Sequence, residues 1–155
     1  MTDFTLRPAT PEDDAFLYAL YCSTRAEEMA AFGFNDAQRD AFLRMQYQGQ
    51  RMQYGQLAGT THHLVLHGGA PVGRLLVMRS DAELRLVDVA LLPQLRGQGV
   101  GTALLRQLQE EAGRTGKPLA LRVLKGNPAA RLYDRMGFAL ERDEGLYLAM
   151  AWRPS

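Results

Sequence analysis

Residues 84–112 read LRLVDVALLPQLRGQGVGTALLRQLQEEA and decide the fold of this chain. An almost continuous apolar run from Leu84 to Leu92 ends at Pro93, which predicts a strand buried on both faces. From Val100 onward, apolar residues recur at helical intervals, and charged or amide residues occupy the other face. The segment therefore predicts a strand, a glycine-rich turn and an amphipathic helix.

The glycine-rich turn predicts a binding site for a phosphate or a pyrophosphate. Glycines leave the backbone bare, so several N–H groups can converge on one anion at the positive start of the helix. A P-loop needs Lys followed by Ser or Thr after its last glycine, but Thr102 follows Gly101 directly. A Rossmann fingerprint needs glycine at the sixth position counted from Gly97, where Thr102 stands. Both of these phosphate loops fit poorly.

The pattern Arg96-x-x-Gly99-x-Gly101 instead resembles the pyrophosphate loop of the GCN5-related N-acetyltransferases (GNAT), which bind acetyl-coenzyme A. In that family the loop follows a central strand and opens a helix, as it does here. The resemblance implies two sets of coenzyme contacts, one on the strand backbone and one on the loop. These contacts are Ala90, Leu91 and Leu92 on the strand, and Arg96, Gly97, Gln98, Gly99, Val100, Gly101 and Thr102 on the loop.

A second motif downstream strengthens the resemblance. Family members often carry Asn, then Ala, then Leu-Tyr and Gly-Phe. The matching residues here are Asn127, Ala129, Leu132-Tyr133 and Gly137-Phe138. Asn127 and Pro128 also predict a helix start, and Gly137 predicts the helix end. The resemblance implies that Asn127 and Arg131 contact the coenzyme, although an ungapped match puts Gly126 at the family's asparagine position, so that assignment stays open.

Tyr133 is the candidate general acid. Acyl transfer from a thioester to an amine requires a neutral amine, donors for the oxyanion and a proton or charge for the departing thiolate. A phenol with a pKa of about 10 stays protonated at neutral pH and can supply that proton. The alternative is a tyrosine that only packs in the core.

Asp88 is the candidate base, because an unpaired carboxylate inside an apolar strand is costly and must be hydrogen-bonded, paired or functional. Glu83, Glu27 and Glu28 are weaker candidates for this role. The resemblance implies no base at Arg122, which stands where several relatives carry a glutamate. Proton removal through water is the remaining alternative.

The rest of the pattern predicts a mixed α/β fold. Apolar stretches at residues 64–66 and 71–78 flank a Gly-Gly turn and predict a hairpin that continues antiparallel into residues 84–92. Residues 119–124 follow a strand and a helix, so we expect them to lie parallel to residues 84–92. The resemblance implies the GNAT fold, a mixed sheet of about six or seven strands with about four helices, in a single domain of residues 1–155.

Composition is that of an ordinary globular protein. The 155 residues are 46% hydrophobic and 23% charged with a net charge of +1, which favours neither nucleic acid nor a membrane surface as partner. One cysteine, Cys22, and the lack of a leader or a long apolar run predict a cytoplasmic protein without an internal disulfide. His62, His63 and His67 predict no metal site, because strand neighbours point to opposite faces and no carboxylate stands at ligand spacing.

Residues 34–53 predict a second helix, which lies on the acceptor side of the cleft in this family. Tyr47, Tyr54 and the nearby glutamines are therefore candidates for contacting substrate, unless they form a solvated face with inward-packed aromatics. We expect an N-acetyltransferase that moves an acetyl group from acetyl-coenzyme A to a primary amine of a small molecule or protein, by direct attack in a ternary complex. The alternative is a non-catalytic acyl-CoA-binding module that acts as a sensor or partner subunit. An edge strand near the C terminus also permits a homodimer.

Overall fold

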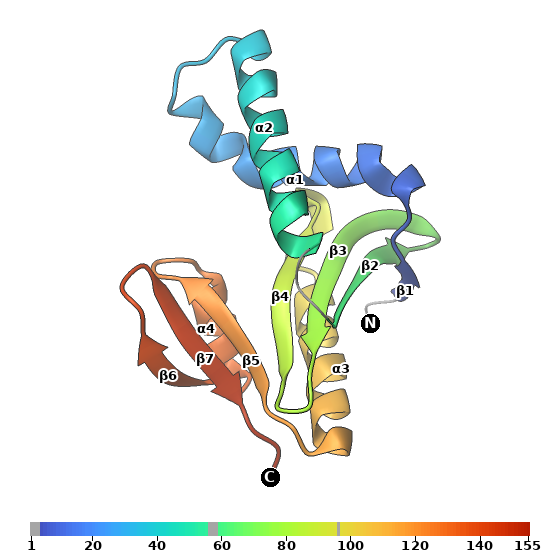
Figure 1. Cartoon of the computed structure of the whole chain (residues 1–155), viewed down its shortest axis with the longest axis vertical. Coiled ribbons are helices and arrows are strands. Elements are labelled where there is room, and N and C mark those ends of the chain that lie inside the picture. Colours follow the sequence, from blue (N-terminus) through green and yellow to red (C-terminus); the bar gives the residue numbers. More distant parts are fainter. Residues whose placement is uncertain (1–3, 56–58, 96) are drawn as a thin grey trace.

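The computed structural model of the protein describes residues 4–55, 59–95 and 97–155. Its seven-stranded sheet has the order β1-β2-β3-β4-β5-β7-β6 (Figure 1). The strands are β1 Thr5–Pro8, β2 Thr60–His67, β3 Ala70–Arg79, β4 Leu84–Leu91, β5 Leu119–Leu124, β6 Ala139–Asp143 and β7 Tyr147–Trp152. The helices are α1 Asp14–Ala30, α2 Asp36–Gly55, α3 Val100–Thr115 and α4 Ala129–Arg135, with short 3-10 turns at Pro11–Asp13 and Pro93–Leu95.

The sheet is mixed, as predicted. Strands β1 to β4 form an antiparallel series, and β5 pairs with β4 in parallel after the connection through α3. Strands β5, β7 and β6 are again antiparallel to their neighbours. The predicted fold class, strand directions and helix number are therefore confirmed.

The strands β4 and β5 pair only at their beginnings and then diverge (Figure 1). Their three paired positions join Leu84 to Leu119, Arg85 to Ala120 and Leu86 to Leu121. On the other side of β4, the register with β3 shifts between Leu86 and Asp88, a β-bulge that leaves Val87 without a counterpart. A bulge bends its strand and increases the local twist, so β4 turns away from β5 where the bulge lies.

The predicted burial of residues 84–92 on both faces is wrong for most of the strand. Leu84 and Leu86 are buried, but all residues from Val87 to Leu91 are only half-buried. The reason is the divergence of β5, which removes one neighbour from the second half of β4. The strand with the longest buried run among those described is β3.

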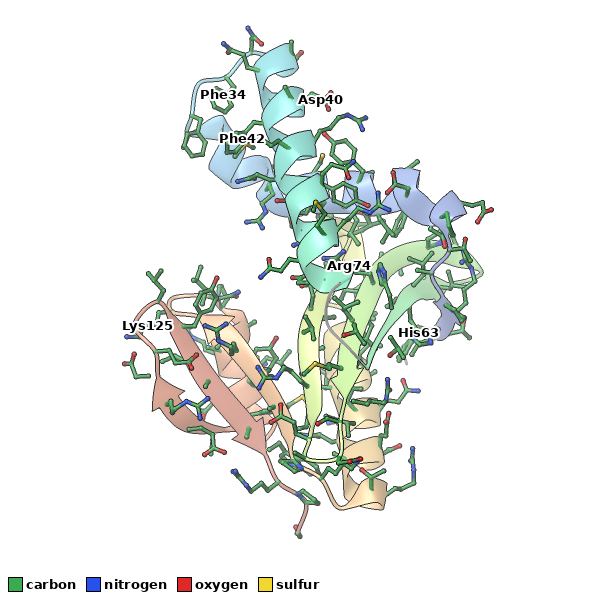
Figure 2. All side chains as sticks on the ribbon, viewed as in Figure 1. Phe34, Asp40, Phe42, His63, Arg74 and Lys125 are labelled. Carbon is green, nitrogen blue, oxygen red and sulfur yellow. The ribbon has the colours of Figure 1, made fainter. Side chains whose placement is uncertain are left out.

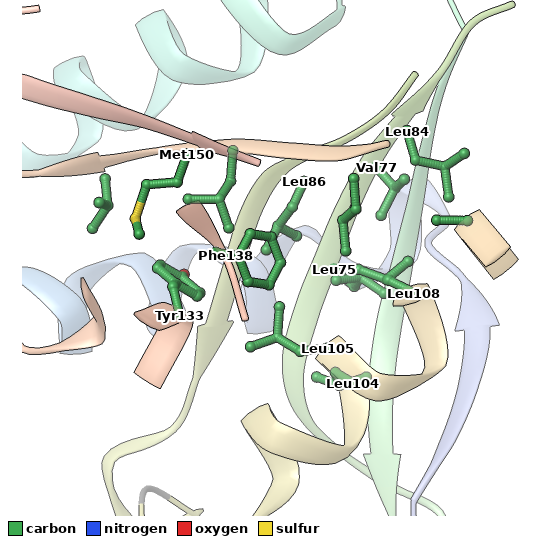
Figure 3. Packing of buried hydrophobic residues seen from close by; sticks show 14 of the residues in the cluster. Leu75, Val77, Leu84, Leu86, Leu104, Leu105, Leu108, Tyr133, Phe138 and Met150 are labelled. Carbon is green, nitrogen blue, oxygen red and sulfur yellow. The ribbon is translucent and has the colours of Figure 1, made fainter. Parts of the chain in front are cut away.

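Helix α3 packs on one face of the sheet through the apolar stripe that its sequence predicts. Figure 3 shows Leu104, Leu105 and Leu108 of α3 against Leu75 and Val77 of β3. Each fully buried Leu or Val side chain stabilises the fold by about 1.5–3 kcal/mol, so this stripe fixes α3 and the loop before it to the sheet.

Helices α1 and α2 cover the opposite face of the sheet and project beyond its end (Figure 1). Their smaller apolar cluster includes Leu17, Tyr21, Leu43 and Tyr47 of the helices and Leu64 of β2. No helix among the described residues has the length and apolar content needed to cross a membrane. Within the same part of the chain, no group of three His, Cys, Asp or Glu side chains could hold a metal ion.

Candidate functional site

In the second half of β4, the edge toward β5 presents backbone N–H and C=O groups that no strand pairs with in the described structure. The N–H of Leu92 donates to the C=O of Val72 at 2.8 Å, so Leu92 faces β3. Backbone groups alternate in direction along an antiparallel strand, and the register between Gly73 and Leu76 of β3 and this part of β4 is continuous. Ala90 therefore also faces β3, and Val89 and Leu91 face the side from which β5 has diverged.

This geometry distinguishes the three expected strand contacts by the direction of their backbone groups. Of Ala90, Leu91 and Leu92, only Leu91 offers its N–H to the opening between β4 and β5. Val89, which was not among the predicted contacts, offers a second N–H group to this opening. The backbone N–H groups of a strand point alternately to its two sides, so Val89 could have been identified once the direction of one such group in β4 was known.

The loop before α3 ends in backbone N–H groups that lack partners inside the helix. Gly97 and Gly99 have φ angles of 75° and 84°, a left-handed conformation that favours glycine, and Gly99 caps the helix. The first intrahelical bond runs from Ala103 N–H to Gly99 C=O, so the amides of Val100 to Thr102 precede it. Together with the positive end of the helix dipole, these amides suit an anion.

Gly101 is not required by the packing of the protein itself. A Cβ atom built at this position would come no closer than 4.0 Å to Leu132, and Gly101 has no left-handed φ angle. The missing side chain keeps the backbone accessible at the start of α3. This bare surface fits a bulky anion such as a pyrophosphate. Arg96, the first residue of the predicted loop motif, lies outside the described residues.

Tyr133 of α4 is buried in the apolar cluster that packs α3 on the sheet, within electrostatic reach of Asp88. Its side chain is 8% exposed and packs against Phe138 with ring centroids 5.7 Å apart. Burial, and after it repulsion from the Asp88 carboxylate, raise the pKa of Tyr133 above its ordinary value. No described residue forms a hydrogen bond with its hydroxyl, so the proton is available.

Asp88 of β4 is paired through one of its two carboxylate oxygens. Arg74 of β3, 6% exposed, donates from Nε to Oδ2 at 2.9 Å and from Nη2 to the same oxygen. Arg74 Nη2 also donates to Gln50 Oε1 at 2.9 Å, and its guanidinium lies 5.4 Å from the centre of the Tyr54 ring. Oδ1 of Asp88 accepts no hydrogen bond from the described residues. Figure 2 shows Arg74 at the end of α2 nearest the sheet.

Arg74 is a candidate functional residue that was not predicted from the sequence. A charged residue inside the apolar stretch of β3 was the available signal, of the same kind that drew attention to Asp88. No local sequence pattern links Asp88 to Arg74. The pairing of β3 and β4 brings the two residues together, because it places Leu76 opposite Asp88 and Arg74 opposite Ala90.

A cavity of about 360 Å³ adjoins Arg74 on the face covered by α1 and α2. Its described lining residues are Ala9, Thr10, Pro11, Asp14, Leu17, Tyr47, Arg51, Tyr54, Gly55, Thr60, His62, Arg74 and Leu76. Both predicted aromatic candidates thus border one cavity, although Tyr47 is 2% exposed and its hydroxyl donates to Asp14 at 3.0 Å. Burial, with that hydrogen bond, raises the pKa of Tyr47 to about 12.

A family model described as "Acetyltransferase (GNAT) domain" matches residues 59–140, which is more than half of the chain. The chain belongs to the GNAT acetyltransferase family. The predicted family and cofactor, acetyl-coenzyme A, are thereby confirmed. The match covers β4, the glycine-rich loop, Asp88 and Tyr133.

Solved structures agree with this GNAT fold across nearly the full chain. The PaiA N-acetyltransferase of Thermoplasma acidophilum, in complex with coenzyme A, is 15% identical with a TM-score of 0.72, and the match covers 98% of this chain and 99% of that one. An acetyltransferase of Thermus thermophilus is 22% identical with a TM-score of 0.69, covering 100% and 98%. Nourseothricin acetyltransferase is 20% identical with a TM-score of 0.62, covering 99% and 100%. No curated protein matches the sequence significantly.

Two predicted coenzyme contacts of this GNAT domain lie at the start of α4. Asn127 Oδ1 accepts the N–H of Ala129 at 2.9 Å. The N-cap of α4 is Pro128, so the helix starts one residue later than the sequence predicts. Asn127 and Arg131 are both exposed. The expected helix end at Gly137 is also confirmed, with the N–H of Phe138 donating to the C=O of Tyr133 at 3.0 Å.

The other candidate bases lie in different surroundings. Glu83 pairs with Arg85 at 2.9 Å, and Arg122 pairs with Glu144 at 2.8 Å. The side chains of Glu27 and Glu28 lie outside the described residues. Asp88 is therefore the carboxylate that the described structure brings to the opening beside Tyr133.

Proposed function

We propose that this protein transfers the acetyl group of acetyl-coenzyme A to a primary amine by direct attack in a ternary complex. One observation carries the proposal: the opening between β4 and β5 brings together an unpaired backbone edge, a protonated phenol and a carboxylate with one free oxygen. These groups belong to Val89 and Leu91, to Tyr133 and to Asp88. Each suits one requirement of acyl transfer.

The coenzyme is assigned to the loop and the β4 edge. The amides of Gly97 to Thr102 would hold its pyrophosphate at the start of α3, and the N–H groups of Val89 and Leu91 would hold the pantetheine and the thioester carbonyl. When bound, acetyl-coenzyme A supplies a thioester carbonyl, at which an amine lone pair forms the new C–N bond as the C–S bond breaks. Asn127 and Arg131 would contact the nucleotide end.

Asp88 and Tyr133 are assigned to the two ends of the proton transfer. Oδ1 of Asp88 would accept an N–H hydrogen bond from the amine and aim its lone pair at the opening, while Arg74 keeps Oδ2 fixed. Tyr133 would donate its hydroxyl proton to the departing sulfur, because its raised pKa keeps it protonated. Asp88 is about one-quarter exposed, so solvent can carry the amine's proton away.

Release of the coenzyme thiol from acetyl-coenzyme A in the presence of a panel of primary amines tests this function. Tyr133→Phe should lower kcat by roughly a hundredfold, the lower end of general acid contributions. Its affinity for coenzyme A should stay within about threefold, because the phenol's proton acts on the reacting atoms. Tyr21→Phe is the matched control, since Tyr21 is buried to a similar degree, with 7% exposure.

Asp88→Asn should raise KM for the amine and lower kcat, whereas Asp134→Asn, at an exposed position of α4, should change neither. If no amine in the panel is acetylated while coenzyme A binds, the protein is a non-catalytic acyl-CoA-binding module and the proposal is wrong. An unchanged kcat in Tyr133→Phe would remove Tyr133 from the mechanism.

A further inference from the structure

Two buried polar atoms beside the cavity have no hydrogen-bond partner among the described residues. They are Oγ1 of Thr60 and Nε2 of His62, both on β2, and both residues line the cavity. Buried polar atoms in native proteins are nearly always hydrogen-bonded, so each of these two atoms calls for an explanation. A ligand in the cavity would supply the missing partners.

The charges around the cavity are already balanced. Arg51 of α2 pairs with Asp14 of α1 at 3.1 Å, and Arg74 pairs with Asp88. His62 adds no charge at neutral pH, because burial and the nearby Arg74 cation lower its pKa. A charged ligand group inside the cavity would find no free counter-ion, and burying an unpaired charge is strongly unfavourable.

The cavity and the free oxygen of Asp88 lie on the same face of the sheet. His62 pairs with Leu76 and Leu76 pairs with Asp88, and directly opposed residues share a face. Two strand spacings separate His62 from Asp88, about 10 Å. Arg74 borders the cavity and also holds Asp88, so one molecule can contact both places.

Building on the proposed function, we propose that this cavity takes the end of the acceptor opposite its amine, and that this end is an uncharged hydroxyl or carboxamide. Thr60 Oγ1 and His62 Nε2 form hydrogen bonds with it. The apolar side chains of Leu17 and Leu76 and the ring of Tyr47 contact the linking chain. A linker of about five carbon atoms, with a hydrogen bond at each end, spans the separation.

Five primary amines with the same five-carbon chain test the chemistry of the distal end. They carry a terminal hydroxyl, carboxamide, carboxylate, second ammonium or methyl group. We expect kcat/KM for the alcohol and the amide to exceed that for the other three by roughly tenfold, about 1.4 kcal/mol, since their ends form two hydrogen bonds at no cost of burying a charge. Equal or better rates with the carboxylate, the diamine or the plain alkylamine would overturn the inference, as would a cavity that holds water alone.

Thr60→Val and His62→Phe test the two residues directly, because each keeps the shape of the side chain and removes its polar atom. Each should reduce the preference for the amino alcohol over the plain alkylamine to about threefold, mainly through KM. The control positions are Thr5, which is exposed on β1, and His63, which pairs with Leu75 of the α3 side of the sheet. Thr5→Val and His63→Phe should keep the full preference. An unchanged preference in both Thr60→Val and His62→Phe would contradict the assignment.

The cavity assignment can be tested by binding even if the proposed function proves wrong. If none of the five amines is acetylated, calorimetry with the amino alcohol and the coenzyme-loaded protein still tests the cavity. Binding that is lost in Thr60→Val and His62→Phe but kept in His63→Phe supports the cavity assignment. Binding no tighter than that of the plain alkylamine overturns it.

Discussion

Asp88 and Tyr133 influence each other across the opening between β4 and β5, and this coupling can be measured. The Asp88 carboxylate adds to the effect of burial in raising the pKa of the Tyr133 phenol above about 10. A general acid acts in its protonated form. Activity should therefore rise with pH as the acceptor amine loses its proton, and the loss of activity that reports phenol ionisation should begin only above pH ~10.

Replacement of Asp88 should shift the pH at which activity is lost on the alkaline side of the profile. Asp88→Asn removes the like charge that disfavours phenolate, so the pKa of Tyr133 falls and the alkaline loss of activity moves to lower pH. The pH profile of kcat for the wild type and Asp88→Asn checks this result. A shift to higher pH, or an alkaline limb that persists unchanged in Tyr133→Phe, would contradict the assignment of Tyr133.

Asp88 also shows what a single sequence reveals about a residue. A carboxylate in an apolar strand predicts a partner or a function, and the structure supplies Arg74 as that partner. The choice of Arg74 depends on the register of β3 and β4 across a bulge, which neither strand's own sequence records. For the same reason, the direction of the backbone groups at Ala90, Leu91 and Leu92 was not predictable.

At the scale of elements, the proposed coenzyme site lies on the unit from β4 through the loop to α3. Thr102 lies in the first turn of α3, where a carboxylate is favourable to the helix dipole and is expected to keep the helix stable. Thr102→Glu would nevertheless place a negative charge beside a bound pyrophosphate. We expect the Kd for coenzyme A to rise by roughly tenfold or more in this variant, at an unchanged or higher Tm.

Thr102→Gln is the matched control for the glutamate variant, because it has the same shape without the charge. Its Kd for coenzyme A should stay within about threefold of that of the wild type. Calorimetric titration and thermal unfolding together check both variants. Equal affinities for the glutamate and glutamine variants would place the pyrophosphate elsewhere.

Elements with strong local signals were predicted well. The bounds of β5 match the predicted residues 119–124, which follow Pro118, and Gly137 ends α4 as expected, because prolines and glycines act locally. The second helix was predicted at residues 34–53 but is found at Asp36–Gly55. Its start carries a signal that the prediction overlooked, because Asn35 and Gln38 exchange the two hydrogen bonds of a capping box, at 2.8 and 3.0 Å.

At the scale of the whole molecule, the proposed function depends on the divergence of two parallel strands. A strand that pairs with β5 along its full length would have no free backbone edge for a coenzyme. The sequence analysis expected a fully buried β4 because it read the apolar run without its neighbours. The opening arises from the bulge at Val87 together with the separate packing of β5 against β7, which are properties of the assembled sheet.

Amide hydrogen exchange along β4, measured by NMR with and without acetyl-coenzyme A, tests the central claim most directly. In the free protein, the amides of Ala90 and Leu92 should exchange slowly because they face β3, and those of Val89 and Leu91 should exchange quickly. Saturating acetyl-coenzyme A should slow exchange at Val89 and Leu91 far more than elsewhere in the strand. Unchanged exchange at these two amides under saturation would show that the coenzyme does not occupy the opening between β4 and β5.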